Sequence, residues 1–199
     1  MAYFTSTRSI VAGFTAAGFL AVVGCGPTSG SGTNPADPGG APAGGEATTG
    51  GEAAAVAYID ARYHYRIDAP GRMTANADGS ASFIGPSERL EVTVVSGASA
   101  ADLSALARAD AKSLGSSAPS FRALSSPSSV TLGGYLMTRF SYRWDAGTSS
   151  VTGKAIQLTS VRYYAPKDAS TVAVITYGIV TDQFDPQGAN DLASTFKWL

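Results

Sequence analysis

Cysteine and histidine are almost absent, since the chain has one of each in 199 residues. A single cysteine forms no internal disulfide, so the core alone must hold the fold together. Transition-metal sites are built from clustered His and Cys ligands, and nucleophilic hydrolysis usually needs a basic partner such as an imidazole. His64 is the only imidazole in the chain. The sequence therefore predicts no catalytic residue, no metal ligand, no cofactor and no enzyme activity.

Charge is scarce as well, and it is balanced. Charged residues make up 15% of the chain, and the formal net charge is -1. Residues 57–199 carry one more basic side chain than acidic ones. A nucleic-acid partner requires a dominant basic surface, so no nucleic acid is expected as a partner.

Only one long apolar run exists, and it lies near the N-terminus at residues 10–23. It is shorter than the roughly 20 residues that a membrane-spanning helix needs. The stretch Val22-Val23-Gly24-Cys25 at its end resembles the cleavage box of bacterial lipoproteins. This resemblance implies a signal peptide over residues 1–24 and lipidation of Cys25, for example with palmitate. An uncleaved anchor helix, or a reactive or intermolecularly bridged Cys25, are the alternatives.

The lipid anchor would place the protein outside the cytoplasm, on the cell membrane or the outer membrane. Residues 25–56 consist mainly of Gly, Pro, Ala, Ser and Thr, and no large apolar side chain occurs between Pro27 and Ala55. Such a segment buries too little surface to offset the entropy of ordering, so it is expected to be a flexible linker. About 30 flexible residues have an r.m.s. span of about 30 Å. The folded domain is then expected over residues 57–199.

Two helices are expected in this domain. Apolar residues at helical spacing predict the first helix over residues 100–114, with Ser99 and Asp102 as a capping box and Gly115 as its end. The second helix is expected to begin at Asp185-Pro186, with the aspartate as N-cap and the proline in the first turn.

Strands are expected on both sides of the first helix. Residues 61–68 alternate, with Tyr63, Tyr65 and Ile67 on one side. Turns are predicted at residues 76–80 and 145–147. Further strands are expected at 82–85, 89–96, 121–124, 130–132, 135–144, 155–165 and 171–180. Short connections between consecutive strands indicate an antiparallel sheet. The fold class is therefore α+β, with helices packed on an antiparallel sheet as an α/β/α sandwich.

Several short motifs of this domain resemble the PsbP-like family, whose fold is shared with the Ran-binding Mog proteins. The motifs are Tyr65-Arg-Ile-Asp-Ala-Pro70-Gly71, Gly133-Gly134-Tyr135, Val161-Arg-Tyr-Tyr164, Ile175-Thr-Tyr177 and Phe184-Asp-Pro186 with Ser194-Thr-Phe196. The resemblance covers about residues 61–199. It implies a binding or assembly protein, and it carries no catalytic or metal-binding residue over to this chain.

Arginines follow two of the expected strands. Arg139 and Arg143 share one side of the long strand, and Arg62 and Arg66 share one side of the first. If these strands are neighbours, an arginine patch for an anionic lipid or an acidic partner results. The alternative is ordinary solubility with cross-strand pairing to acids such as Glu91.

The remaining candidates are aromatic, imidazole and carboxylate side chains. Asp182 and Asp185 offer oxygen ligands to a hard cation, or serve as a loop acid and a helix cap. His64 is expected on the polar side of the first strand. A ligand cage or ordinary packing are the two interpretations of the tyrosines Tyr63, Tyr65, Tyr135, Tyr163, Tyr164 and Tyr177.

The function expected from these features is that of a membrane-anchored binding or assembly-accessory protein. Its partners are then the membrane, through Cys25, and an unidentified protein. The alternative is a carrier of a small ligand or lipid, or an envelope hydrolase, using a pocket between helix and sheet.

Overall fold

The computed structural model describes residues 55–85, 87–98, 100–149 and 152–199, and Ala53–Leu199 form one compact unit. The expected signal peptide, the Cys25 lipidation site and most of the expected linker lie outside the described residues. In the described part of the chain, no helix is both long and apolar enough to cross a membrane.

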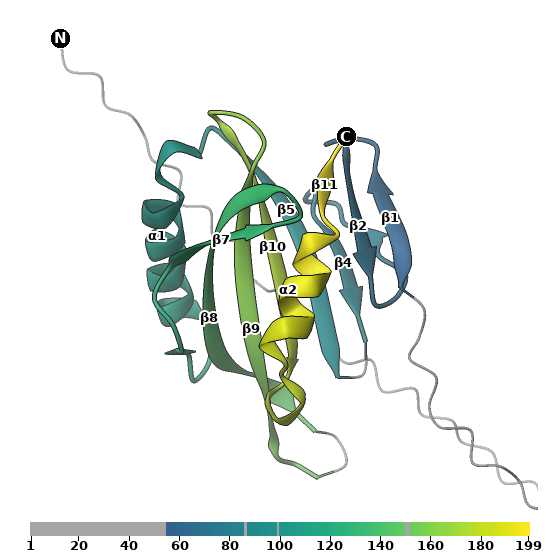
Figure 1. Ribbon diagram of the computed structural model, residues 1–199. Helices are drawn as coiled ribbons and strands as arrows, with labels where there is room; N and C mark the ends of the chain where they lie inside the picture. Colours follow the sequence, from purple (N-terminus) through teal and green to yellow (C-terminus); the bar gives the residue numbers. More distant parts are fainter. Residues whose placement is uncertain (1–54, 86, 99, 150–151) are drawn as a thin grey trace, which may run out of the picture. The chain divides into compact units, whose positions relative to one another are not determined.

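The strands form two antiparallel sheets (Figure 1). The small sheet has the order β1-β2-β11, and its strands are Val56–Asp60, Tyr65–Ala69 and Lys197–Trp198. The large sheet has the order β3-β4-β5-β10-β9-β8-β6, and β7 also pairs with β8. Its strands in chain order are Thr74–Ala75, Ala81–Ile84, Glu88–Ser96, Arg122–Ala123, Ser128–Leu132, Tyr135–Thr148, Ala155–Pro166 and Thr171–Val180.

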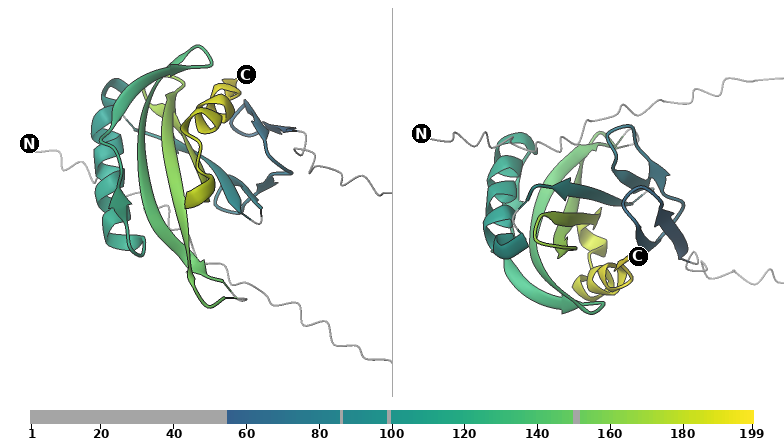
Figure 2. Two further views of the ribbon diagram at one scale, coloured as in Figure 1. Left: turned by 60° about the horizontal axis from the view of Figure 1, so that its bottom comes forward. Right: turned by 90° about the horizontal axis from the view of Figure 1, so that it is seen from above.

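Each face of the large sheet is covered by a helix. Figure 2 shows α1 (Leu103–Ser117) on one side of the sheet and α2 (Pro186–Ser194) with the small sheet on the other. This arrangement confirms the expected α+β fold with helices packed on both faces of an antiparallel sheet. It also explains why β9 is buried at every position from Leu158 to Ala165, since a strand covered on both faces has no polar side.

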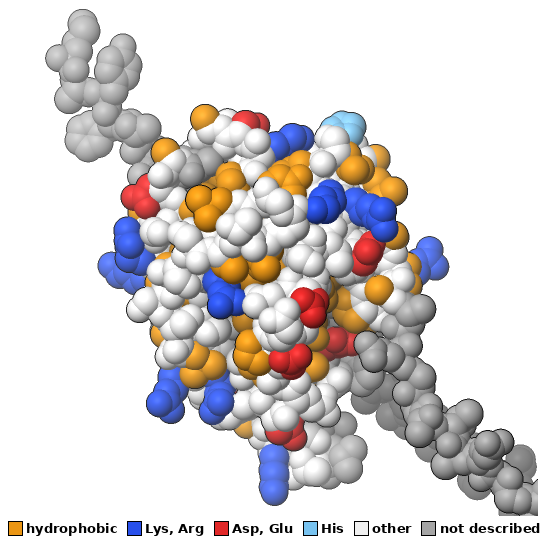
Figure 3. All heavy atoms as spheres, viewed as in Figure 1, with side chains coloured by type: hydrophobic (Ala, Val, Ile, Leu, Met, Phe, Trp, Pro, Cys, Tyr) orange, Lys and Arg blue, Asp and Glu red, His pale blue; other side chains and the backbone are white. Residues whose placement is uncertain are grey.

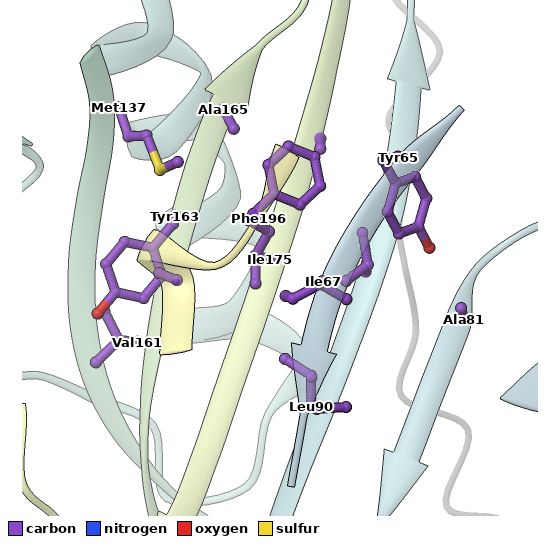
Figure 4. Packing of buried hydrophobic residues seen from close by; sticks show 14 of the residues in the cluster. Tyr65, Ile67, Ala81, Leu90, Met137, Val161, Tyr163, Ala165, Ile175 and Phe196 are labelled. Carbon is purple, nitrogen blue, oxygen red and sulfur yellow. The ribbon is translucent and has the colours of Figure 1, made fainter. Parts of the chain in front are cut away.

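The two faces hold separate cores. Ala107 and Leu114 of α1 pack on Phe140, Tyr142 and other residues of one face. On the other face, Ala189 and Ala193 of α2 pack with residues of both sheets. Figure 4 shows Phe196 lying between the large sheet and Tyr65 and Ile67 of β2. The small sheet is therefore joined to the large one by the C-terminal segment that follows α2.

The expected strand over residues 61–68 is wrong in its first half. A hairpin turn occupies residues 61–64, and it connects β1 to β2. The buried carboxylate of Asp60 causes this turn, because its Oδ1 accepts hydrogen bonds from the backbone N–H of Arg62 (2.9 Å) and Tyr63 (2.8 Å). His64 closes the turn with a left-handed φ of 57°. It is thus a turn residue and not part of a strand.

The first helix begins close to its expected start and ends later. A single 3₁₀ turn, Ala100–Asp102, precedes α1, and Asp102 itself is the N-cap, with Oδ1 accepting from the N–H of Ala105 (2.7 Å). Ser99 lies outside the described residues. Gly115 does not end the helix, which continues to Ser117. Ala118 is extended because Pro119 follows it, and the residue before a proline disfavours helical geometry.

The turn expected at residues 145–147 is also wrong. Strand β8 continues to Thr148, with an irregular register between Asp145 and Thr148. Gly147 adopts a φ of +136° inside this stretch, as a glycine in a β-bulge does. The chain turns only after Ser149, whose N–H donates to the carbonyl of Lys154 (2.8 Å). The glycine therefore marks a bulge in a longer hairpin. The turn expected at residues 76–80 is confirmed, since the N–H of Asn76 donates to the carbonyl of Ser80 (2.8 Å).

Candidate binding surface

An aromatic cluster joins the small sheet to the large one near the C-terminus. Strand β11 places Trp198 opposite Tyr65. The ring centroid of Phe196 lies 5.5 Å from that of Tyr65, 5.2 Å from that of Trp198 and 6.4 Å from that of Tyr135. These spacings are those of favourable aromatic pairs. The cluster holds the two sheets and the end of α2 in a fixed arrangement.

Three cations lie on the rings at the outer edge of this cluster. The Nζ of Lys167 is 4.9 Å from the Trp198 ring centroid and donates to the carbonyl of Tyr63 (3.2 Å). The Nζ of Lys197 is 5.8 Å from the ring centroid of Tyr135, and the guanidinium carbon of Arg62 is 5.0 Å from that of Tyr63. Cations at these distances are attracted to the ring faces.

We call this surface the basic end, and it consists of Arg62, His64, Lys167, Lys197 and Leu199. Figure 3 shows the histidine and basic side chains together at the upper right, beside apolar side chains. Leu199 is 63% exposed, and its N–H donates to the carbonyl of His64 (2.7 Å). The C-terminal residue is therefore held against the β1–β2 turn.

The cations of the basic end have no carboxylate partner in the described residues. The ion pairs of the described residues are Arg66–Asp68 (3.0 Å) and Arg162–Asp110 (2.5 Å), and neither includes a residue of the basic end. The Nζ of Lys197 instead donates to the carbonyl of Gly133. Aromatic rings and carbonyls do not neutralise a cation as a paired carboxylate does, so this end presents three cations without a direct ion pair beside an exposed leucine. Such a surface complements an acidic surface with an apolar contact.

The expected arginine patch does not form as one surface. Arg62 lies in the turn and Arg66 in the small sheet, whereas Arg139 and Arg143 lie on β8 of the large sheet. Glu91 does not pair with any of them, because it lies on β5 opposite Thr176. Burial raises the pKa of Glu91, with the charge of Asp78 adding to the rise and that of Arg162 opposing it.

The structure also divides the six candidate tyrosines. Tyr164 belongs to the core beneath α1, whereas the other five belong to the core on the opposite face, so Tyr163 and Tyr164 point to opposite faces of β9. Burial raises the pKa of Tyr163 to about 12, although nearby Arg139 opposes the rise, and the hydroxyl of Tyr163 donates to Asn190 Oδ1 (3.0 Å). The hydroxyl of Tyr177 donates to a carboxylate oxygen of Glu88 (2.9 Å). The tyrosines therefore do not form a common cage.

The acidic candidates near the second helix have separate roles. Asp185 is the N-cap of α2, with its two carboxylate oxygens accepting from the N–H groups of Gln187 and Gly188 (both 2.9 Å). This confirms the expected cap. Asp182 lies in the preceding 3₁₀ turn, Thr181–Gln183. Among the residues that the structure describes, no three His, Cys, Asp or Glu side chains come together as metal ligands do.

Sequence reasoning missed the two lysines of the basic end and the tryptophan on whose ring Lys167 lies. Lys167 follows the last residue of β9, and Lys197 and Trp198 form the two-residue strand β11. The alternation of apolar Phe196, basic Lys197 and apolar Trp198 is the one local sequence signal of this short strand.

Comparison with known proteins gives similarity at the level of the fold. No family model and no curated protein sequence matches the chain. The Ran-binding protein Mog1p of Saccharomyces cerevisiae is similar with a TM-score of 0.50 at 11% identity, over 72% of this chain and 95% of that one. A crystal structure from Bacteroides thetaiotaomicron has a TM-score of 0.48 at 11% identity over 72% of this chain, which spans 48% of that protein.

A further similar structure is LpqN, described as involved in cell envelope biogenesis of Mycobacterium tuberculosis. It aligns over 74% of this chain and 83% of its own, with 13% identity and a TM-score of 0.37. Taken with the sheet order and the two covering helices, the match to Mog1p shows that the described domain has a fold like that of the Ran-binding Mog proteins.

Proposed function

We propose that this protein is an extracytoplasmic lipoprotein whose domain binds a protein partner, or assists its assembly, without catalysing a reaction. The observation that carries the proposal is the basic end, where Arg62, Lys167 and Lys197 lie on aromatic rings without a carboxylate partner in the described chain. Its partner is a protein with an acidic surface and an apolar contact for Leu199.

The position of β1 is compatible with a membrane anchor on one end of the domain and a partner at the basic end. Val56 pairs with Ala69 and Asp60 pairs with Tyr65, so the start of β1 lies at the opposite end of the hairpin from the turn that carries His64. Four steps along a strand cover about 14 Å. If Cys25 is acylated and residues 25–56 form a linker, the linker joins the domain at the end away from the basic end. The basic end then remains free to meet a partner while the anchor holds the protein on the membrane.

The similar fold of Mog1p is a further support, because that protein is described as Ran-binding. A fold of this kind therefore presents a surface to another protein in at least one case. The identity is 11%, so the partner of this chain is inferred from its own surface chemistry.

The partner is tested by cross-linking in intact membranes and purification of the chain. A triple variant, Arg62→Gln, Lys167→Gln and Lys197→Gln, is expected to lose at least nine-tenths of the cross-linked partner, because it removes the uncancelled charge. The control is Arg108→Gln with Lys112→Gln, which removes exposed charge from α1 and leaves the basic end unchanged. Equal recovery of the partner with both variants would refute the proposed surface.

The anchor is tested separately with Cys25→Ala. We expect this variant to lose acylation and to leave the detergent phase, since two or three acyl chains suffice for stable membrane attachment. Mass spectrometry of the mature N-terminus shows whether residue 25 carries the diacylglyceryl group. Unchanged detergent partitioning and unchanged mobility of Cys25→Ala would exclude the anchor while leaving the partner experiment valid.

A further inference from the structure

A second basic surface lies on the large sheet, where β6 pairs with β8. Arg122 is directly opposite Arg143, and Ala123 is opposite Tyr142. Directly opposed residues of an antiparallel pair point to the same face, with Cβ atoms about 5 Å apart. Tyr142 points toward α1, since its ring lies 5.4 Å from that of Phe121 in the α1 core. Arg122 and Arg143 therefore both project from the opposite face.

Opposed like charges destabilise a strand pair unless something compensates them. In the described chain, no carboxylate lies within 4.0 Å of either guanidinium. The ion pairs found there involve Arg66 and Arg162 instead. The Nε of Arg143 is buried and has no hydrogen-bond partner. A buried donor without a partner is unfavourable, because it has lost its hydrogen bond to water. Arg143 thus has a buried donor without an acceptor, and Arg122 places a second, exposed guanidinium opposite it.

The same face of β8 carries further donors. Arg139 donates from Nη1 to the neutral amide oxygen of Asn190 (2.5 Å), so its charge is also not cancelled by an acid. Ser141 lies between Arg139 and Arg143, and its hydroxyl contacts that of Ser125 (3.0 Å). Asp145 is the one acid of β8 on this face, and its Oδ1 is buried without a partner. Three guanidinium groups therefore outweigh one carboxylate.

We propose that Arg122 and Arg143 bind a phosphate group, with Arg139 and Ser141 extending the site along β8. A phosphate accepts parallel hydrogen bonds from a planar guanidinium, and it cancels charge where two such groups are opposed. Figure 3 shows basic side chains side by side at the lower left, over β6 and the lower part of β8, with no acidic side chain beside them.

This phosphate site is distinct from the basic end. Arg143 lies eight positions along β8 from Tyr135, which is about 26 Å at 3.3 Å per residue. The two surfaces can therefore be changed separately, and failure of one proposal does not decide the other. The phosphate group belongs either to a free phosphate-bearing molecule or to the headgroup of an anionic lipid, and the experiment has one arm for each.

Both arms use the full-length chain with Cys25→Ala, so that acyl chains do not add their own membrane binding. In the first arm, inorganic phosphate is titrated and the thermal midpoint is recorded, because a ligand that binds only the native state raises it. In the second arm, the chain is sedimented with phosphatidylglycerol vesicles and with phosphatidylcholine vesicles. The test variant is Arg122→Gln with Arg143→Gln. The control, Arg108→Gln with Lys112→Gln, has the same net charge.

We expect the test variant to bind at least tenfold more weakly than the parent, and the control to bind like the parent. A shift in the phosphate arm identifies a free phosphate-bearing molecule, and preference for phosphatidylglycerol over phosphatidylcholine in the second arm alone identifies a lipid headgroup. Equal behaviour of the two variants, or no binding by the parent in either arm, would overturn the proposal.

A second measurement guards against misfolding of the double variant. In phosphate-free buffer of low ionic strength, Arg122→Gln alone is expected to keep or raise the thermal midpoint, because it removes the repulsion from Arg143. Addition of phosphate is then expected to raise the thermal midpoint of the parent more than that of Arg122→Gln. A lower midpoint for Arg122→Gln in the absence of phosphate would show that the opposed arginines are not in conflict.

Discussion

Arg162 is the most deeply buried charged residue in the described domain. It lies on β9 beneath α1 and is 3% exposed. Its Nη1 donates to Asp110 Oδ2 (2.5 Å), and the same oxygen accepts from the hydroxyl of Tyr164 (2.7 Å). Burial alone lowers the pKa of Arg162, but the oxygens of Tyr142, Asp110 and Tyr164 together raise it. The guanidinium is therefore charged and depends on Asp110 for compensation.

Replacing Asp110 removes this compensation. We expect Asp110→Ala to lower the free energy of unfolding by about 3 kcal/mol, since breaking a buried pair leaves an uncompensated charge. The estimate is at the lower end of the usual range because the Asp110 side chain is 20% exposed. Urea unfolding measures the loss, and exposed Asp191→Ala is the matched control, expected to cost less than about 0.5 kcal/mol. Equal losses for both variants would mean that Arg162 does not need its partner.

Single residues were predictable from the sequence where their role is local. Asp185 was recognisable as a cap because the proline that starts the helix is the next residue. The alternation of Tyr65 and Ile67 likewise gave the buried side of β2. Arg162 and Asp110 are 52 positions apart, and neither has a neighbour in sequence that marks it as half of a pair. Contacts of this kind depend on how the helix is placed on the sheet, which spacing alone does not determine.

At the scale of elements, long strands and helices were predictable, whereas short or bulged ones were not. The β1–β2 hairpin was missed because its turn is made by the side chain of Asp60 and not by glycine or proline. Strand β11 was missed because its two residues pair with β2, more than 130 positions earlier. The basic end was therefore not predictable from the sequence, since it is built by the β1–β2 hairpin, β11 and the β9–β10 turn.

The β7–β8 turn packs closely against the end of α2. Gly133 has a φ of +59°, and a Cβ placed on it would overlap the carbonyl oxygen of Ser194 at the end of α2. Gly134 has a φ of +92°, but its Cβ would meet nothing within 4 Å. Substitution of either glycine thus strains the backbone, but only substitution of Gly133 also creates a clash with α2.

This difference gives a matched pair of variants. Gly134→Ala is expected to cost about 1 kcal/mol from backbone strain alone. Gly133→Ala is expected to cost about 2 kcal/mol more, because the added methyl group must displace the end of α2. Chemical denaturation of both variants measures the difference directly. If the two alanine variants are equally stable, the turn does not pack against α2 as the structure shows.

At the scale of the whole molecule, two cores share one sheet. The α1 core runs from Val95 to Val180 in sequence, and the α2 core takes residues from Tyr58 to Trp198. Strands β8, β9 and β10 contribute alternate residues to both cores. The sandwich was predictable because apolar residues on both sides of these strands require cover on both faces. The third partner of the α2 core, the small sheet, was not, because its strands lie at opposite ends of the domain's sequence.

Both cores consist of residues that follow position 57, and Ala53–Leu199 form one compact unit. We therefore expect a chain lacking residues 1–52 to fold by itself, with an unfolding midpoint in urea equal to that of the full-length Cys25→Ala chain. The dependence of the unfolding free energy on urea is the sharper measurement, because it scales with the surface that unfolding exposes. If residues 1–52 bury no surface on the domain, both proteins have the same slope as well as the same midpoint. A smaller slope and a lower midpoint for the shortened chain would mean that these residues pack on the domain, and they could not then act as a linker that gives it reach.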